Sequence, residues 1–117
     1  MKIRIKDLRL RTIVGVFEWE QKTPQEVVVN VELEFDGEPA ARSDELSDSV
    51  DYKAIKQQLL RDVQAARYKL LEKLARHVLD IVLSQEKVLR ATVEVDKPHA
   101  LRFAESVSVV CSGEKGK

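Results

Sequence analysis

The order of hydrophobic periods along the chain limits its fold more than any other feature. Two segments alternate apolar and polar residues, two further segments repeat apolar residues at helical spacing, and two final segments alternate again. A period of two is typical of strands, and a period near 3.6 is typical of helices. The chain therefore predicts an α+β domain with the element order ββααββ.

The four expected strands cover residues 2–16, 26–36, 88–97 and 106–111, with an alternative start of the last strand near Phe103. In the first strand, the apolar residues Ile3 and Ile5 occupy odd-numbered positions, whereas Leu8 and Leu10 occupy even-numbered positions. This parity change predicts a β-bulge near Asp7. In the second strand, every odd-numbered residue from 27 to 35 is apolar, so we expect one buried face and antiparallel pairing.

The two expected helices cover residues 51–67 and 70–85, and Asp51 or Ser49 is the predicted N-cap of the first. A polar connection over 36–49 precedes them. The prediction is an antiparallel four-stranded sheet with both helices on one face. Such long strands leave open edges, and association into a closed ring would satisfy them, so we expect a homo-oligomer.

Length and composition narrow the class of protein. A chain of 117 residues predicts one domain, 1–117, with a polar tail from about residue 113. Twenty basic and twenty acidic residues give zero net charge, which disfavours nucleic acid as a partner. The single cysteine is typical of a protein from a reducing compartment. The first residues contain no continuous apolar run of the kind found in a signal peptide, so we expect a cytoplasmic protein with no leader and no membrane contact. Two histidines without a ligand motif predict no metal site.

Lys97 is the first candidate functional residue. It follows Ala91, Val93 and Val95 in the alternation of its strand, so it falls on the apolar face. Lysine is rarely buried without a partner, and a desolvated lysine amine can carry protons near neutral pH. The alternative is that the strand ends at Lys97 and the ammonium reaches water.

Three more candidates stand at the ends of elements, where sites concentrate. Glu20 follows the first strand in a loop with Phe17 and Trp19; the alternative is that these aromatic residues cap the core and leave Glu20 solvated. Tyr52 begins the first helix, where packing is the alternative role. Glu72 lies in the first turn of the second helix, where the helix dipole alone favours an acid, but the same position can hold a planar heterocycle.

Four motifs occur in one order: Gly15-x4-Glu20, Val50-Asp51-Tyr52, Leu70-Leu71-Glu72-Lys73-Leu74-Ala75 and Asp96-Lys97-Pro98. Together they resemble the dihydroneopterin aldolase and epimerase family over Ile3 to about Ser112. Residues 3–12 and 96–103 are most similar to its dihydroneopterin triphosphate 2'-epimerase branch, from which Pro98 departs. The resemblance implies the tunnelling fold (T-fold), tetrameric rings that stack into an octamer, and active sites between subunits.

The resemblance also implies roles for individual residues. Glu72 matches the carboxylate that holds the amino-pyrimidine edge of a pterin, and Leu71 matches a backbone contact to the ring. Lys97 matches the catalytic lysine, Glu20 the catalytic and substrate-contacting glutamate near it, and Tyr52 a tyrosine contributed across the subunit interface to catalysis and binding. The implied chemistry is retro-aldol cleavage of the C1'–C2' bond. The pterin ring accepts the electrons, so no metal or other cofactor is expected.

Two enzymatic outcomes follow from this chemistry. The leading expectation is an isomerase that epimerises C2' of the 7,8-dihydroneopterin triphosphate side chain to the dihydromonapterin form, on the route to tetrahydromonapterin. The alternative is a lyase, dihydroneopterin aldolase, which releases glycolaldehyde and 6-hydroxymethyl-7,8-dihydropterin in folate biosynthesis. Four cations are candidates for the triphosphate by composition alone, and none is assigned to it: Arg102, His99, Arg11 and Lys69.

A third hypothesis comes from another class, a non-catalytic α+β module that binds RNA on its sheet. Only six aromatic residues and zero net charge disfavour it, because RNA-binding sheets need a stacking platform.

Overall fold

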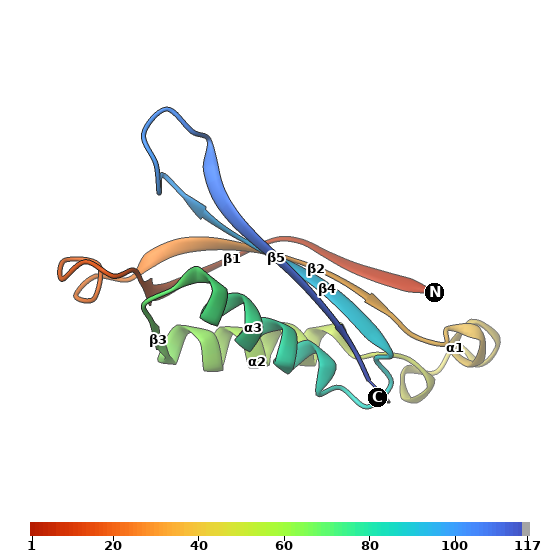
Figure 1. Cartoon of the computed structure of the whole chain (residues 1–117). Helices are drawn as coiled ribbons and strands as arrows, with labels where there is room; N and C mark the ends of the chain where they lie inside the picture. Colours follow the sequence, from red (N-terminus) through yellow and green to blue (C-terminus); the bar gives the residue numbers. More distant parts are fainter. Residues whose placement is uncertain (116–117) are drawn as a thin grey trace.

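A five-stranded sheet forms the centre of the computed structural model, which describes residues 1–115 (Figure 1). Its strands are β1 (Lys2–Val14), β2 (Gln25–Glu34), β3 (Arg67–Tyr68), β4 (Arg90–Pro98) and β5 (Ser106–Glu114). They lie in the order β3-β1-β2-β4-β5. The short β3 pairs with β1 in parallel, and all other neighbours are antiparallel.

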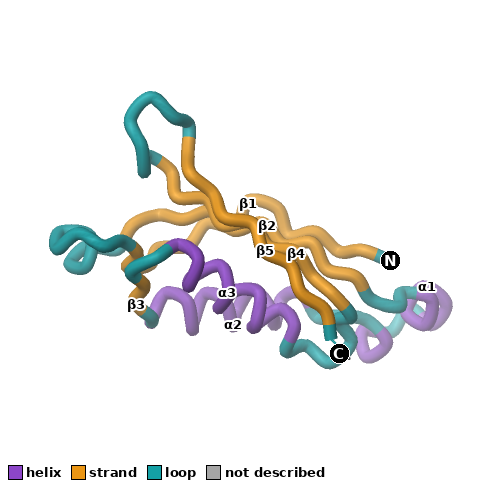
Figure 2. Tube along the Cα trace, in the orientation of Figure 1, coloured by secondary structure: helices purple, strands orange, loops and turns teal. Residues whose placement is uncertain are grey.

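Two helices, α2 (Tyr52–Ala65) and α3 (Leu71–Leu83), cover one face of this sheet and leave the other face open (Figure 2). Helix α2 packs on β1, and α3 packs on β4 and β5. The core lies between the two layers, and its largest fully buried side chains are Leu10, Leu33, Ile55, Leu59, Leu74 and Leu79. The predicted α+β class with two helices on one face is therefore confirmed.

The predicted bulge in β1 is also confirmed. The pairing of β1 with β2 shifts register between Ile5 and Leu8, and Asp7 has a φ of 54°. The side-chain oxygen of Asn30 accepts a hydrogen bond from the Asp7 N–H at 2.9 Å, so this left-handed residue is held in place. Beyond the bulge, even-numbered residues face the helices, and Thr12 is buried with them.

The structure corrects the predicted strand count and the predicted connection. The fifth strand, β3, is two residues long, too short to show any period in the sequence. The connection over 36–49, for which the sequence predicted polar character and no helix, contains α1 (Glu38–Ser43) and the 3₁₀ helix η1 (Leu46–Asp48). Neither element contains a buried residue, so neither could be recognised from an apolar repeat.

The chain end and the last hairpin differ from expectation as well. Residues 113 and 114, placed in a polar tail by the sequence, are the last residues of β5, whereas residues 116–117 of that expected tail lie outside the described residues. The alternative start near Phe103 is wrong, because residues 99–105 form the loop between β4 and β5.

Asp51 is the N-cap of α2, as predicted, and Ser49 is not. One carboxylate oxygen of Asp51 accepts hydrogen bonds from the N–H groups of Lys53 and Ala54, both at 3.1 Å. The cap fixes Tyr52 as the first residue of the helix. Across residues 1–115, the helices are too short or too polar to cross a membrane.

Candidate active site

Lys97 lies on the buried face of β4, as its phase in the strand predicted. The three residues that precede it on this face, Ala91, Val93 and Val95, are all buried. The side chain of Lys97 is only 13% exposed, although the residue is one position from the end of the strand. A lysine in this position needs a partner, because an isolated ammonium is costly to remove from water.

Glu20 of the same chain is that partner. Its carboxylate oxygen Oε2 accepts a hydrogen bond from Nζ of Lys97 at 2.6 Å, and its side chain is 8% exposed. The two residues are 77 positions apart in the sequence, so the tertiary fold alone brings them together. The alternative in which Glu20 is solvated is wrong.

Two further donors reach the Glu20 carboxylate. The N–H of Phe17 donates to Oε1 at 3.2 Å, and the side-chain amide of Gln25 donates to Oε2 at 3.4 Å. Burial acts to raise the pKa of Glu20, but the hydrogen bonds from Lys97, Phe17 and Gln25 outweigh it and hold that pKa below its ordinary value. The site therefore contains a carboxylate and an ammonium in direct contact.

The loop that carries Glu20 is fixed by its own glycine and by β3. Gly15 has a φ of 150°, and a Cβ atom at this position would lie 2.2 Å from the carboxyl carbon of Glu20. The N–H of Gly15 donates to the Tyr68 carbonyl at 3.0 Å. The side-chain amide of Gln21 donates to the carbonyls of both Gly15 and Tyr68, at 2.6 and 2.9 Å. The backbone conformation thus favours glycine here, and any side chain would also displace the Glu20 carboxylate.

The two aromatic residues of this loop point the opposite way from the carboxylate. Phe17 is 63% exposed and Trp19 is 62% exposed, whereas Glu20 between Trp19 and Gln21 is buried. The interpretation that these aromatic residues cap the core is therefore wrong. They are exposed apolar side chains in the same loop as Glu20.

Glu72 and Leu71 lie in the first turn of α3, as predicted. The carboxylate of Glu72 is exposed, and Leu71 is partly buried against the core. The first N–H groups of a helix have no partner within the helix, so this turn offers both donors and a carboxylate to a ligand. The geometry is suitable for a heterocycle with donors and acceptors on one edge.

Tyr52 does not join the other candidates within one chain. It is an exposed residue at the start of α2, and β3 follows the opposite end of that helix. Figure 1 shows β3 beside the end of α3 that carries Glu72. A helix of 14 residues is about 20 Å long at about 1.5 Å per residue, so the length of α2 separates Tyr52 from the end of the molecule that holds Glu72.

Sequence reasoning missed Gln21 and Gln25. Gln25 begins β2 and is in phase with Val27 and Val29 on the buried face, which is the same signal that identified Lys97. Gln21 gave no signal, because its role depends on the carbonyl of Tyr68, a residue of the unpredicted strand β3.

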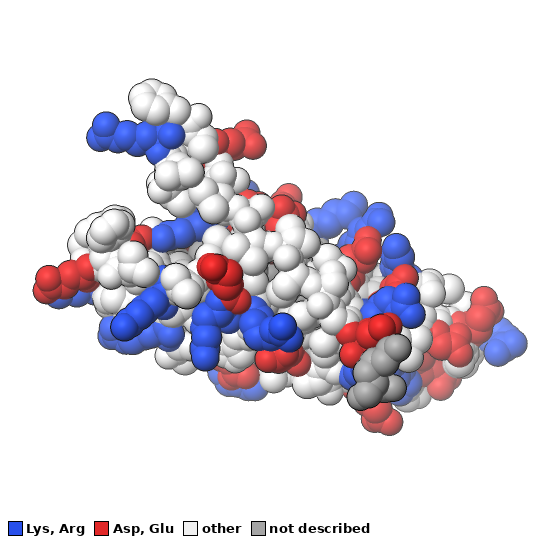
Figure 3. Space-filling model, viewed as in Figure 1, with Lys and Arg blue, Asp and Glu red and all other residues white. Residues whose placement is uncertain are grey.

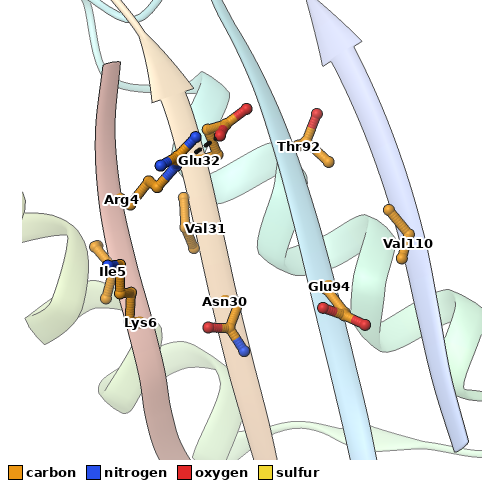
Figure 4. Close-up of a pocket in the computed structure, with 9 residues that line it drawn as sticks. All are labelled: Arg4, Ile5, Lys6, Asn30, Val31, Glu32, Thr92, Glu94 and Val110. Carbon is orange, nitrogen blue, oxygen red and sulfur yellow. Dashed lines mark hydrogen bonds and ion pairs between the residues drawn. The ribbon is translucent and has the colours of Figure 1, made fainter.

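A separate shallow cavity of about 260 Å³ lies on the open face of the sheet (Figure 4). Arg4 in its wall is already paired with Glu32 at 2.8 Å. None of the predicted site residues lines this cavity. Within residues 1–115, no three His, Cys, Asp or Glu side chains are grouped as a metal site requires. The Glu20–Lys97 pair is therefore the best-defined chemical feature of the described chain.

Comparison with known proteins identifies the family. The sequence profile of the family described as dihydroneopterin aldolase (FolB) matches residues 3–112. The chain belongs to the dihydroneopterin aldolase family. The resemblance inferred from the four motifs is thus confirmed.

Two relatives within this family carry different activities in their names. The chain is 40% identical to a dihydroneopterin triphosphate 2'-epimerase of Pseudomonas aeruginosa, over 97% of this chain and 93% of the relative. It is 31% identical to a dihydroneopterin aldolase of Escherichia coli K12, over 91% and 87% of the two chains. Both relatives are enzymes.

A solved structure supports the fold. The crystal structure of Escherichia coli dihydroneopterin aldolase in complex with neopterin matches with a TM-score of 0.92 and 29% identity, over 97% of this chain and 98% of that one. The expected tunnelling fold is confirmed, with five strands in this chain rather than four.

Proposed function

We propose that this protein epimerises C2' of the 7,8-dihydroneopterin triphosphate side chain to the dihydromonapterin form. The observation that carries the proposal is the buried Glu20–Lys97 contact of 2.6 Å, in a chain 40% identical to an epimerase of this name. A buried acid and base in direct contact are suited to moving protons, which is the main requirement of retro-aldol and aldol chemistry.

The cleavage step requires two proton transfers that balance each other. The C1'–C2' bond breaks as the 2'-hydroxyl loses its proton, and the bonding electrons move into the pterin ring, where N5 gains a proton. Lys97, oriented by its hydrogen bond to Glu20, is the proposed donor of the proton to N5. The amine that remains accepts the hydroxyl proton, directly or through water, so the pair ends the step as it began.

The fate of the two-carbon aldehyde decides between epimerase and aldolase. If the aldehyde turns and adds back through its other face, C2' is inverted by the reverse of the same proton transfers. If it leaves, the products are a glycolaldehyde species and 6-hydroxymethyl-7,8-dihydropterin. Aldolase activity is the second candidate function, because the 31% identical relative is named for it.

Glu72 and Leu71 are the proposed pterin contacts. The exposed carboxylate of Glu72 accepts hydrogen bonds from the amino group and ring N–H of the pyrimidine edge, and Leu71 contributes its backbone to the ring. The neopterin in the Escherichia coli aldolase structure supports a pterin as the ligand class.

The complete site is proposed to form between subunits of a tetrameric ring, two of which stack into an octamer. Tyr52 supports this arrangement, because α2 separates it from Glu72 and a second copy is needed to bring it to the substrate. The outer edge of β5 has no strand beside it in the described chain, so it is available to pair with the next copy. Tyr52 from the neighbour then orients or protonates the side chain of the pterin.

One incubation distinguishes the two activities. The protein is mixed separately with 7,8-dihydroneopterin and with its triphosphate, and the products are separated by chromatography. We expect the 2'-epimer of the triphosphate to accumulate. If aldehyde release dominates with both compounds, the protein is an aldolase. If neither compound reacts and neither quenches the fluorescence of Trp19, both assignments fail.

A further inference from the structure

A cleft of about 380 Å³ separates the outer surface of α3 from the segment that leads into it. Helix α3 lines it with Lys73, Arg76 and Asp80, and β3 adds Arg67. Figure 3 shows Lys and Arg side chains gathered over the end of α3 next to β3. In a chain with zero net charge, this local excess of positive charge needs an explanation.

These three cations have no acidic partner in the described chain. No carboxylate oxygen lies within 4.0 Å of the charged nitrogens of Arg67, Lys73 or Arg76 among residues 1–115, not even that of Asp80 in the same cleft. Arg67 is oriented by one hydrogen bond, from Nη1 to the Gln21 carbonyl at 2.9 Å. Its remaining guanidinium donors are free for a ligand.

His77 lies in the same wall and is held in place by a hydrogen bond to the Tyr68 side chain. Its Nδ1 is hydrogen-bonded to the Tyr68 hydroxyl at 2.5 Å. Burial, with a smaller contribution from Asp62, raises the pKa of Tyr68 to about 12, so the phenol keeps its proton. Nε2 of His77 has no hydrogen-bond partner among the described residues, so it is available to a ligand.

We propose that this cleft binds phosphate groups. Arginine and lysine recognise phosphate oxygens through charge-assisted hydrogen bonds, and Arg76 can do so with two parallel bonds. Nε2 of His77 supplies a further polar atom, and the hydrogen bond to buried Tyr68 keeps the ring from turning away. None of these residues belongs to the Glu20–Lys97 site.

The cleft is nevertheless connected to that site through β3. The Tyr68 carbonyl accepts hydrogen bonds from Gly15 and Gln21 in the loop that carries Glu20, while the Tyr68 side chain extends to His77 in the cleft. The ligand is therefore either the triphosphate tail of the proposed substrate or a separate phosphorylated small molecule. Both ligands would bind through the same phosphate oxygens, and measurement of KM distinguishes between them.

Inorganic tripolyphosphate is the probe for the first test, and isothermal titration calorimetry on the full chain is the measurement. We expect saturable binding, which Arg76→Gln and Lys73→Gln each weaken about tenfold, the effect of losing one charge-assisted hydrogen bond. Lys56→Gln is the matched control, because Lys56 is an exposed residue of α2 that loses the same charge and does not line the cleft. Glutamine is a good helix former, so all three variants keep their helices.

The proposal is overturned if the wild-type chain does not bind tripolyphosphate saturably. It is also overturned if Lys56→Gln weakens binding as much as the two cleft variants do, since net charge alone then accounts for the affinity. Neither result depends on turnover, so failure of this site is distinguishable from failure of the proposed enzyme activity.

A second measurement identifies the source of the phosphate and rests on the proposed function. If the cleft holds the substrate's own tail, Arg76→Gln raises KM for 7,8-dihydroneopterin triphosphate about tenfold and leaves KM for 7,8-dihydroneopterin unchanged. If both KM values stay unchanged while tripolyphosphate binding is lost, the cleft serves a separate phosphorylated molecule.

Discussion

The Glu20–Lys97 pair predicts a large thermodynamic coupling between two residues that are 77 positions apart. The test is a double-mutant cycle with Glu20→Gln, Lys97→Met and the double variant. Removal of one partner from a buried ion pair costs about 3–5 kcal/mol, because the remaining charge stays buried without compensation. The side chains are 8% and 13% exposed, so solvent screening reduces this cost little.

The two single variants differ in what they leave behind. Glu20→Gln removes the negative charge that compensates buried Lys97, so we expect a loss of about 3–5 kcal/mol. Lys97→Met leaves a carboxylate that still accepts from Phe17 and Gln25, so we expect about 2–3 kcal/mol. The double variant contains neither charge and should lose at least about 2 kcal/mol less than the sum.

Urea unfolding at one chain concentration, followed by far-UV circular dichroism, measures all four free energies of unfolding. The matched control is the exposed pair Arg9 and Glu26, whose nitrogen and oxygen are 3.2 Å apart and whose coupling should stay below about 1 kcal/mol. If the Glu20–Lys97 coupling is below about 0.5 kcal/mol, the two residues act independently and the described site is wrong.

Three more predictions concern the same site. Lys97→Ala should lower turnover by about 10²- to 10⁴-fold in the epimerase assay, and near-normal turnover contradicts its role in proton transfer. Gly15→Ala should reduce both turnover and the urea midpoint, because the added Cβ would lie 2.2 Å from the Glu20 carboxyl carbon; an unchanged crystal position of Glu20 in that variant contradicts the steric reason. The pKa of Glu20 is lowered on folding, so its stabilisation is complete above its ordinary pKa of 4.5 and disappears as pH falls through the lower folded value. The difference in urea midpoint between wild type and Glu20→Gln should therefore shrink from pH 6 toward about pH 3, and a constant difference contradicts this linkage.

The sequence predicted those parts of the molecule that depend on periodicity. The bulge at Asp7, the buried face that includes Lys97 and the Asp51 cap each produce a local pattern, and the structure contains all three. Helix α1 and strand β3 produce none, because α1 buries no residue and β3 has only two residues. A helix or strand can be recognised in the sequence when its buried residues recur at a regular spacing. Elements without such a repeat cannot be predicted in this way.

In the site as well, individual residues could be predicted from local sequence patterns, whereas their contacts could not. Glu20 and Lys97 were identified as candidates, but their contact depends on a loop whose direction is set by Gly15 and by the carbonyl of Tyr68. The outward orientation of Phe17 and Trp19 could not be predicted either, since their apolar character alone favours burial. Only the three-dimensional arrangement shows that the acid, rather than the aromatic residues, occupies the interior.

The missing side chain at Gly15 has a consequence for how this protein can evolve. The space that a Cβ would occupy is filled by the carboxyl group of Glu20, so a larger residue at position 15 would displace that carboxyl group. A lineage that replaces the glycine must move the acid, give it up or rebuild the loop, whereas a lineage that loses the acid still has a φ of 150° at position 15, which favours glycine. We therefore expect homologues that retain Glu20 to retain the glycine, and a homologue that retains Glu20 but carries a larger residue at position 15 should also have a loop of different length.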